Sequence, residues 1–465
     1  MQPRSEIFRE YDIRGVVGRD LDAEAAEIIG GAFGTYLGRA GVRQVVIGHD
    51  SRVSSDELYQ AAIRGLTQTG CHVFAIGLAL TPMLYFAQRH FKAEGGVMVT
   101  ASHNPPEFNG FKLAHGPGTL YGTQIQEIRD LAGQGRFSRG RGTVERREVL
   151  PAYQAILAEK IRLGPRRLRV VLDCGNGTAG AFAPELLRQW RCEVFPLYCD
   201  LDPTFPHHHP DPVEPSNLTD LIQAVREERA DLGIGLDGDG DRIGVVDDRG
   251  EILWGDLLMA IFWREVLAVH PGAVALVEVK CSQALVDEIR RLGGRPEFTR
   301  TGHSLIKARM RERGAVFAGE MSGHMFFADE YYGYDDAVYA AGRLLRLLSR
   351  QDRPLSRIAE EIPRYHTTPE IRVACPDEKK FSVVTALVEE FRERYEVIDV
   401  DGARVVFPDG WALVRASNTQ PVLVVRAEGT TRAALERAKS LLEDALRRFP
   451  EVSPIQWDDG GPAAR

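Results

Sequence analysis

Four short segments of this 465-residue sequence gather the side chains that could do chemistry. The first, residues 97–106, reads VMVTASHNPP and places Ser102 in a loop that follows a short apolar run and is closed by Asn104 and Pro105. A serine held at the end of a buried strand can act as a nucleophile, although Ser, Asn and Pro also build ordinary turns. The residues of the other three segments favour the chemical interpretation.

Three aspartates at alternate positions, Asp237, Asp239 and Asp241, indicate a metal site. They follow a strand-like run, in which alternate side chains share one face, and the glycines between them let the chain bend so that the carboxylates can converge. Oxygen ligands favour a hard ion, Mg²⁺ or else Ca²⁺ or Mn²⁺. An acidic turn without a metal is the alternative.

An EF-hand loop shares the D-x-D-x-D start but does not fit, because its sixth position holds Arg242 in place of glycine and its twelfth holds Asp248 in place of glutamate. A carboxylate-held Mg²⁺ completes its shell with water or phosphate oxygen, so phosphoryl transfer is the natural chemistry and Ser102 could carry the group. Arg242 could bind the phosphoryl oxygens or pair with its acidic neighbours.

Two further segments offer groups for a phosphorylated polyol. Residues 415–421, RASNTQP, join a guanidinium, hydroxyls, an amide and backbone N–H groups in one loop between strands, which suits a dianion, although a polar hairpin is the alternative. Residues 319–324, GEMSGH, offer Glu320 and Ser322 for sugar hydroxyls and His324 as a general acid or base.

Weaker signals come from isolated charges. Tyr11 and Arg14 in YDIRG precede the first strand, and Lys112 follows the serine loop; each cation could face phosphates or solvent. The tract 207–209, HHH, is interpreted as a structural loop rather than a metal site. The turn 175–177, GNG, lacks the full G-x-G-x-x-G pattern, so NAD is not supported.

Composition limits the class of protein. The chain is 44% hydrophobic and 27% charged with a net charge of −8, so no global basic field exists for nucleic acid or an anionic membrane. The six cysteines form no C-x-x-C pair and predict free thiols. No apolar run is long enough to span a bilayer and no signal peptide is recognisable, so we expect a cytoplasmic protein.

The elements that must position these residues alternate between strands and helices. Strands are predicted at 45–48, 97–99, 169–172, 232–236, 274–279 and 316–318, and helices at 56–69, 179–190, 217–229, 256–268, 283–292, 303–313 and 335–349. This order predicts βαβ units with mostly parallel sheets, covered on both faces.

The pattern changes after residue 369. Strands at 397–400, 403–407, 411–415 and 422–426, joined by Asp-Gly turns and flanked by helices at 379–394 and 431–447, predict an antiparallel α+β domain. We therefore expect four domains: 1–148 with the serine loop, 149–250 with the metal loop, 251–363 with the sugar loop and 364–465 with the phosphate loop.

These motifs together resemble the α-D-phosphohexomutase superfamily, specifically its bacterial phosphomannomutase/phosphoglucomutase branch. They occur in the family's order between positions 11 and 421, one in each expected domain. The resemblance implies an α/β fold of four domains around a central cleft: three related α/β domains with mixed sheets and a C-terminal α+β domain like the TATA-binding protein.

The resemblance also implies roles for residues. Ser102 would be the phosphoserine, and an oxygen of Ser102 with Asp237, Asp239 and Asp241 would hold Mg²⁺. Family positions near the phosphoserine are matched by Arg14, Lys112, Arg242 and His324, whereas His103 is expected to be structural. Positions that bind substrate are matched by Tyr11, Lys280, His303, Glu320, Ser322, Arg415, Ser417, Asn418 and Thr419.

The implied reaction interconverts hexose 1-phosphate and hexose 6-phosphate, with glucose or mannose as the sugar, through a hexose 1,6-bisphosphate that turns end for end. A hinge near 364–369 is expected to let the last domain loosen during this turn. Met321 resembles enzymes that accept glucose and mannose, while phosphoglucosamine mutases more often have Gln there and remain the alternative within the family. We expect hexose phosphates as partners and no binding to nucleic acid or membrane. The protein is expected to be a monomer or a small homo-oligomer.

A phosphatase would expect an early D-x-D at the end of the first strand, which is not where the triad Asp237, Asp239 and Asp241 lies. A non-catalytic sugar-phosphate sensor would tolerate loss of the Ser102 hydroxyl.

Overall fold

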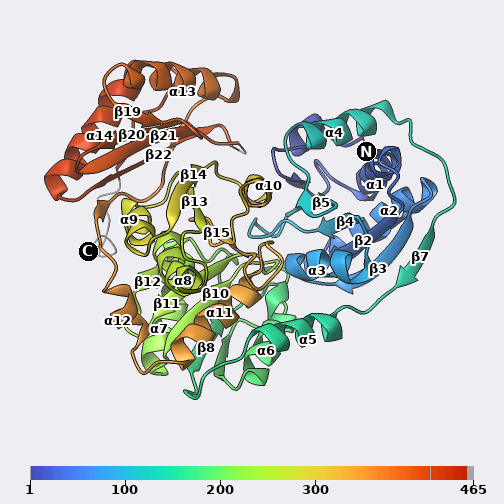
Figure 1. Ribbon diagram of the computed structural model, residues 1–465. Helices are drawn as coiled ribbons and strands as arrows, with labels where there is room; N and C mark the ends of the chain where they lie inside the picture. The colour runs from blue at the N-terminus through green and yellow to red at the C-terminus, as the bar shows by residue number, and fades with distance from the viewer. Residues whose placement is uncertain (1, 419, 458–465) are drawn as a thin grey trace. The chain divides into compact units, whose positions relative to one another are not determined.

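The computed structural model describes residues 2–418 and 420–457 and groups the chain into two compact units. Unit 1 consists of residues 1–254 and 322–357, and unit 2 consists of residues 255–321 and 358–465. The ribbon in Figure 1 labels the elements in chain order. Each unit is described here by itself.

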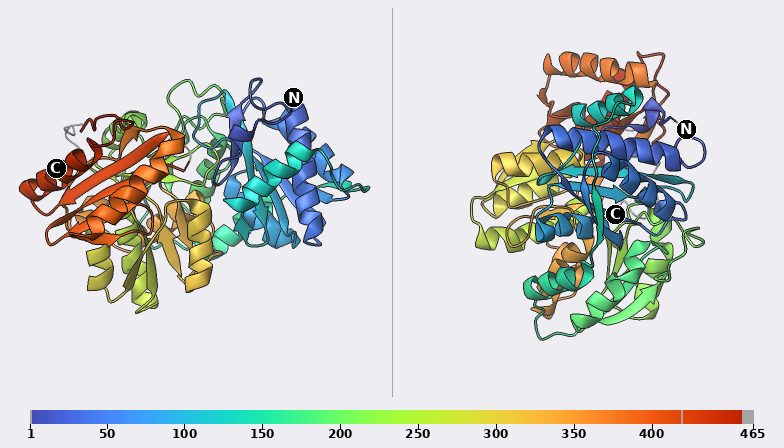
Figure 2. Two further views of the ribbon diagram at one scale, coloured as in Figure 1. Left: turned by 90° about the horizontal axis from the view of Figure 1, so that it is seen from above. Right: turned by 90° about the vertical axis from the view of Figure 1, so that its right-hand side faces the viewer.

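The first sheet of unit 1 has the order β1-β5-β4-β2-β3-β7 and is mixed rather than mostly parallel. Strand β5 runs antiparallel to β1 and β4, while β4, β2, β3 and β7 run parallel to one another. The strands are β1 (Ile13–Val16), β2 (Gln44–His49), β3 (His72–Leu78), β4 (Gly95–Val99), β5 (Phe108–His115), β6 (Gly118–Thr119) and β7 (Thr143–Arg146), and the sheet can be followed from two further directions in Figure 2.

Four helices accompany this sheet: α1 (Ala23–Arg39), α2 (Ser55–Gln68), α3 (Thr81–Phe91) and α4 (Thr123–Gln134). Helix α1 begins at Asp22, whose carboxylate accepts a hydrogen bond from Ala25 N at 2.9 Å. Helices α1 and α2 approach closely because Gly65 has no side chain; a Cβ there would lie 2.0 Å from Glu27 O. A bulkier residue would force the two helices apart.

The second sheet of unit 1 has the order β12-β11-β10-β8-β9. Strand β10 is parallel to β8 and antiparallel to β11, so the loop between β10 and β11 is a hairpin connection. The strands are β8 (Arg169–Asp173), β9 (Glu193–Leu197), β10 (Leu232–Leu236), β11 (Ile243–Asp247) and β12 (Ile252–Leu253), with helices α5 (Leu150–Lys160), α6 (Ala183–Gln189) and α7 (Thr219–Glu227). Unit 1 also contains β16 (Met325–Phe327) and α11 (Ala337–Ser349).

The continuous helix predicted at 179–190 is wrong in the structure. A 3₁₀ turn at Thr178–Ala181 is followed by a break at Phe182, and α6 starts only at Ala183 with Pro184 in its first turn. Proline fits the first turn of a helix, where its missing N–H is not needed, but it would interrupt an interior. The chain therefore restarts its helix at that residue.

Unit 2 contains a parallel arrangement in which β13 (Val274–Glu278) lies between β14 (Arg295–Thr299) and β15 (Phe317–Gly319). Helices α8 (Gly255–Val269), α9 (Gln283–Arg291) and α10 (His303–Arg313) accompany these strands, and α12 (Leu355–Ala359) spans the boundary between the two units' residue ranges. Ser282 begins α9 by accepting a hydrogen bond from Ala284 N.

The C-terminal part of unit 2 is the expected antiparallel α+β domain. Its sheet has the order β17-β22-β21-β20-β19, with β18 paired to β22, and α13 and α14 lie on one face of it (Figure 1). The elements are β17 (His366–Thr367), β18 (Ile371–Ala374), α13 (Asp377–Arg392), β19 (Glu396–Ile398), β20 (Ala403–Phe407), β21 (Gly410–Ala416), β22 (Val422–Gly429) and α14 (Arg432–Leu446). Leu387, Val414, Val425 and Leu442 share the core beneath the helices.

Candidate active site

Ser102 lies in a short loop between β4 and β5 and is only 2% exposed. Its backbone is left-handed, with φ of 52°, and its N–H donates to Thr100 Oγ1 at 2.9 Å. This conformation is costly for a residue other than glycine. It directs the Ser102 hydroxyl toward Asp237, to which Oγ donates a hydrogen bond of 2.6 Å.

The imidazole of His103 lies 3.2 Å from Ser102 Oγ through its Nδ1. Desolvation, with the nearby cations Arg242 and Arg14, holds the pKa of His103 well below its ordinary value. The ring is therefore neutral at pH 7 and lends no positive charge to the serine.

The three aspartates follow β10 and are fully buried, with Asp237, Asp239 and Asp241 each 0% exposed. One carboxylate oxygen of each lies within 4.8 Å of the others, which suits a single cation. They converge in the hairpin turn that follows β10, where Gly240, with φ of 75°, reverses the chain. The predicted convergence, with glycines that let the chain bend, is confirmed.

The donor set of this cluster fits a hard divalent ion. The backbone N–H groups of Asp241 and Arg242 both donate to Asp237 Oδ1 at 3.0 Å. Asp239 Oδ2 accepts from Thr81 Oγ1 at 2.5 Å, while Asp239 Oδ1 is buried and has no hydrogen-bond partner among the described residues. A buried carboxylate oxygen without a donor is the kind of group that a cation satisfies.

Lys112 of β5 is the cation that balances these carboxylates in the structure. Its Nζ lies 2.7 Å from Asp239 Oδ2 and also pairs with Asp241. Burial lowers the pKa of Lys112, but the two carboxylates outweigh burial and hold its pKa above the ordinary value. Burial, with the charges of Asp241 and Asp239, raises the pKa of Asp237 well above its ordinary value.

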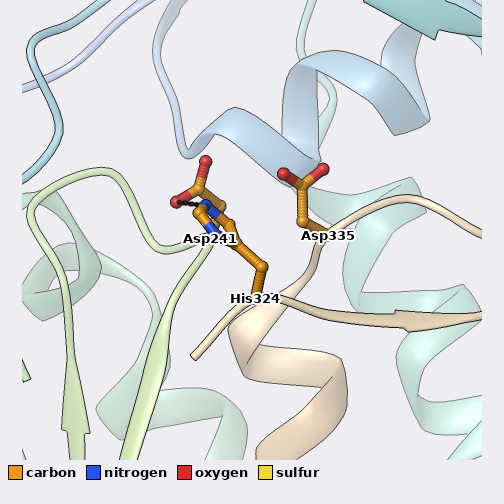
Figure 3. A group of neighbouring side chains, drawn as sticks. All are labelled: Asp241, His324 and Asp335. Atoms are coloured by element: carbon orange, nitrogen blue, oxygen red, sulfur yellow. Dashed lines mark ion pairs between the residues drawn. The ribbon is translucent and has the colours of Figure 1, made fainter. Parts of the chain in front are cut away.

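His324 lies beside Asp241, just before β16, and Figure 3 shows both next to Asp335 at the start of α11. His324 Nε2 is 3.3 Å from Asp241 Oδ1, and Ser322 Oγ is 2.9 Å from His324 Nδ1. Burial raises the pKa of Asp241, yet Lys112, His324 and Arg242 together hold that pKa well below its ordinary value.

Arg14 and Arg242 complete this group in unit 1. Arg14 donates to Asn104 Oδ1 and to Asp12 Oδ2, each at 2.5 Å, so it reaches the serine loop. Arg242 Nε lies 3.4 Å from His324 Nε2. The structure thus brings Arg14, Ser102, Lys112, the aspartates, Arg242 and His324 together through an unbroken set of contacts.

The predicted sugar-site residues of unit 2 form a second group. Lys280 is 7% exposed, and its Nζ lies 2.8 Å from Glu370 Oε2 and 3.4 Å from Glu278 Oε1. Although burial opposes it, the carboxylates of Glu278 and Glu370 raise the pKa of Lys280 above its ordinary value. Glu320 Oε1 accepts from Gly302 N at 2.7 Å, directly before His303 opens α10.

Thr301 joins this group to the phosphate-loop residues of the last domain. Its N–H donates to Asp401 Oδ2 at 3.1 Å, and its hydroxyl donates to Glu278 Oε1 at 2.7 Å. Asp401 also accepts from Arg415 Nε at 2.9 Å. The arginine is therefore held by a carboxylate that also contacts the sugar-site loop.

Two buried arginines of the last domain hold the backbone around Lys280. Arg404 donates to Val279 O at 2.6 Å and Cys281 O at 2.7 Å, and Arg426 donates to Lys280 O at 2.5 Å. The Arg404 guanidinium lies 3.8 Å from the centre of the Trp411 ring. These contacts fix the backbone from which Lys280 projects.

Other predicted residues are placed as follows. Ser417 Oγ accepts from Gln420 N at 3.2 Å within the loop between β21 and β22, and Asn418 lies beside it in that loop. Thr419 lies outside the described residues, and Tyr11 lies just before β1. The tract 207–209 is indeed a loop; within it His208 Nε2 lies 3.0 Å from Asp173 Oδ2.

Sequence reasoning missed several residues that contact the site. Thr81 bonds to Asp239, Glu278 pairs with Lys280, and Arg52 binds the backbone of the serine loop. A threonine at the start of a helix or a glutamate at the end of a strand has no local pattern that marks it. Only the fold shows that Thr81 lies against Asp239.

Comparison with known proteins decides the family. Models described as the alpha/beta/alpha domains I, II and III and the C-terminal domain of phosphoglucomutase/phosphomannomutase match residues 5–139, 151–250, 254–365 and 370–445. The chain belongs to the phosphoglucomutase/phosphomannomutase family. It is thus a phosphohexomutase of the α-D-phosphohexomutase superfamily, an intramolecular phosphotransferase with the four-domain α/β fold of that superfamily.

Relatives of this phosphohexomutase match along nearly its whole length. The phosphomannomutase/phosphoglucomutase of Pseudomonas aeruginosa is 44% identical over 97% of this chain and 98% of its own. The phosphoglucomutase of Neisseria meningitidis is 41% identical over 96% of this chain and 98% of its own. A crystal structure of a family protein from Burkholderia thailandensis, 40% identical, superposes with a TM-score of 0.91 over 97% of this chain and 99% of that chain.

Two expectations concern the chain as a whole. All six cysteines are free thiols in the structure, as predicted. Among the helices of the described residues, none combines the length and the apolar character that a bilayer span requires.

Proposed function

We propose that Ser102 carries the phosphoryl group in the reversible interconversion of hexose 1-phosphate and hexose 6-phosphate. The observation that carries the proposal is the 2.6 Å hydrogen bond from Ser102 Oγ to Asp237 in a fully buried triad of carboxylates. A serine whose oxygen lies beside a buried cluster of carboxylates that can hold a cation, and that pairs with the ammonium of Lys112, can carry a phosphoryl dianion. Family membership supports glucose and mannose phosphates as the substrates.

Asp237, Asp239 and Asp241, with an oxygen at Ser102, would hold Mg²⁺. Bound there, Mg²⁺ would withdraw negative charge from the phosphoryl oxygens and so lower the barrier to transfer. The buried oxygen Asp239 Oδ1 supports this assignment, because no donor among the described residues bonds to it and a cation could do so instead.

The remaining residues of unit 1 supply charge and move protons. The Arg14 and Arg242 guanidiniums present planar donors to phosphoryl oxygens, and Lys112 offsets the charge of the carboxylates. His324, oriented by Ser322 at its Nδ1, presents Nε2 as the group that takes a proton from the attacking sugar hydroxyl and returns it to the leaving oxygen.

Further residues, most of them in unit 2, would bind the rest of the substrate. Glu320 and Ser322 are proposed to accept hydrogen bonds from sugar hydroxyls, with Lys280 and His303 beside the ring. Tyr11 and the loop of Arg415, Ser417, Asn418 and Thr419 would bind the phosphate that is not reacting. The hexose 1,6-bisphosphate formed in the first transfer would reverse its direction and return its other phosphate to Ser102.

Ser102→Ala tests the proposal. Loss of the carrier oxygen should reduce turnover by at least about a thousandfold, while binding of hexose phosphate, measured by calorimetry, should change little. The matched control is Ser349→Ala, since Ser349 is similarly buried and its hydroxyl donates to Arg346 O in α11 and accepts from Gly164 N, neither of which is a proposed site residue. Turnover in Ser102→Ala equal to that of the control would refute the assignment.

Two measurements refine the proposed function. Intact-mass analysis of the wild type after incubation with hexose 1,6-bisphosphate should detect one added phosphoryl group, absent from Ser102→Ala. Coupled assays on glucose, mannose and glucosamine phosphates would rank the sugars. A preference for glucosamine phosphate would favour the alternative within the family. A cytoplasmic location and a monomer or small homo-oligomer stay predictions.

A further inference from the structure

Arg52 lies between β2 and α2, and its guanidinium binds backbone carbonyls along most of the serine loop. Its Nη2 donates to Ser102 O at 2.7 Å and Asn104 O at 2.6 Å, and its Nη1 donates to Pro105 O at 2.7 Å and Phe108 O at 3.0 Å. The two terminal nitrogens carry four hydrogens in total, so each hydrogen has its own carbonyl acceptor. One side chain therefore fixes four carbonyls within the seven residues from Ser102 to Phe108.

The guanidinium is also placed by its surroundings. The Arg52 side chain is 1% exposed, and its Nε lies 3.3 Å from Asp50 Oδ2. Asp50 in turn accepts a bond from Arg52 N at 3.1 Å and one from the hydroxyl of Ser55, which begins α2. The ring of Phe205 lies over the guanidinium, 5.2 Å from its central carbon. Charge, hydrogen bonds and an aromatic face all hold this side chain in one orientation.

The bond to Ser102 O bears on the chemistry. Ser102 has a left-handed backbone, which an L-residue keeps only where its surroundings hold it. Its carbonyl is bound by Arg52 and its N–H by Thr100, so both peptide groups that flank the Cα are fixed. The direction of Oγ toward Asp237 follows from that fixed backbone.

We propose that Arg52 is a positioning residue of the phosphoryl transfer: through four backbone carbonyls it holds the serine loop in the one conformation that directs Oγ at the metal-binding aspartates. The inference rests on the proposed role of Ser102 as carrier. Lysine would not replace arginine here, because an ammonium has three donors at one point, whereas these carbonyls are spread around a planar fork.

The test compares Arg52→Lys with Arg343→Lys. Arg343 is also 1% exposed and pairs with Asp329, but it lies in α11, and its guanidinium packs over the ring of Phe327. In Arg52→Lys, kcat should fall by roughly 10- to 100-fold, since a misplacement of about 1 Å costs about that much, while KM for hexose 1-phosphate should stay within about threefold. Arg343→Lys should keep both constants.

A spectroscopic readout separates positioning from general stability. The ³¹P resonance of phosphorylated Ser102, formed with hexose 1,6-bisphosphate, should shift or broaden in Arg52→Lys and not in Arg343→Lys, with melting temperatures recorded for both. If Arg52→Lys does not fold, Phe205→Leu removes only the ring over the guanidinium, and the same kcat loss should appear in weaker form. An unchanged kcat and an unchanged ³¹P resonance in the folded variant would overturn the inference.

The outcome is distinguishable from failure of the proposed function. Full turnover in Ser102→Ala would remove the carrier role itself. Loss of turnover in Ser102→Ala together with normal turnover in Arg52→Lys would remove only the role of Arg52.

Discussion

Substitution of Gly238 by alanine tests how closely the metal loop and the serine loop must approach. A Cβ at position 238 would lie 2.3 Å from Ser102 O and 3.3 Å from Pro210 Cγ. An ordinary carbon–oxygen contact is at least about 3.3 Å, so the two backbones must separate by about 1 Å. The Cβ of residue 238 is attached directly to the main chain, and Ser102 O belongs to the main chain. Neither atom can therefore move without its backbone.

The displacement acts on the bond between Ser102 Oγ and Asp237, now 2.6 Å long. A misplacement of about 1 Å reduces turnover by about 100-fold, which corresponds to about 2.7 kcal/mol of activation free energy. A coupled assay of hexose 1-phosphate conversion measures kcat, and calorimetry measures substrate affinity, which should change much less than kcat.

Gly133→Ala is the matched control for this prediction. Position 133 lies in α4, and a Cβ there meets no atom within 4 Å. Alanine should therefore leave kcat unchanged and raise the free energy of unfolding by up to about 1 kcal/mol. If Gly238→Ala turns over at more than about a third of the wild-type rate, the close approach is not needed for catalysis and the reasoning is refuted.

Three further predictions concern charge, helix ends and metal. The pKa of Glu370 is lowered from 4.5 to about 2, chiefly by Lys280, so the pair stabilises the fold above about pH 4.5 and loses this effect as pH falls toward 2. Because Glu370 is 31% exposed, Glu370→Gln should lower the free energy of unfolding by only about 1 kcal/mol at pH 7, as measured by urea unfolding. The difference from wild type should vanish near pH 2. An equal difference at both pH values would contradict this. Thr431→Ala removes the hydroxyl that accepts from Ala434 N at the start of α14 and should cost about 1 kcal/mol in the same assay, whereas Thr431→Ser should be neutral. Removal of divalent ions with EDTA should abolish most turnover and added Mg²⁺ should restore it, and full activity in EDTA would exclude a metal role for the aspartates.

The sequence could identify the parts of the site whose chemistry lies in consecutive residues. Asp237, Asp239 and Asp241 were found because three carboxylates within five residues are rarely tolerated without a cation or a cationic side chain. Arg52 could not be found in this way, since its partners are backbone carbonyls at positions 102–108 and carry no side-chain signal. Thr81 was missed for a similar reason, because it contacts Asp239 across 158 positions of the chain.

The fold shows the same division. Strand β20 at Ala403–Phe407 and helix α10 at His303–Arg313 have the bounds that the sequence predicted. Helix α3 was not predicted; the polar residues Thr81 and Gln88 are buried together with the apolar residues between them, so the polarity of the sequence does not mark the exposed face. Strand β1 is short and half-buried, and its antiparallel pairing with β5, which makes the sheet mixed, depends on contacts about a hundred positions away.

The contacts of Thr301 couple motion to binding. Thr301 donates to both Glu278 and Asp401, and Lys280 pairs with Glu370, so these polar bonds connect the sugar-site strand to the last domain. If that domain turns about the segment 364–369, as the proposed reorientation of the bisphosphate requires, these bonds must lengthen or break. If closure of the domain raises the affinity for a ligand by some factor, then by thermodynamic reciprocity binding of that ligand shifts the equilibrium toward the closed domain by the same factor. The change in sugar-binding affinity on closure and the change in the opening equilibrium on sugar binding are then one coupling free energy measured in two ways.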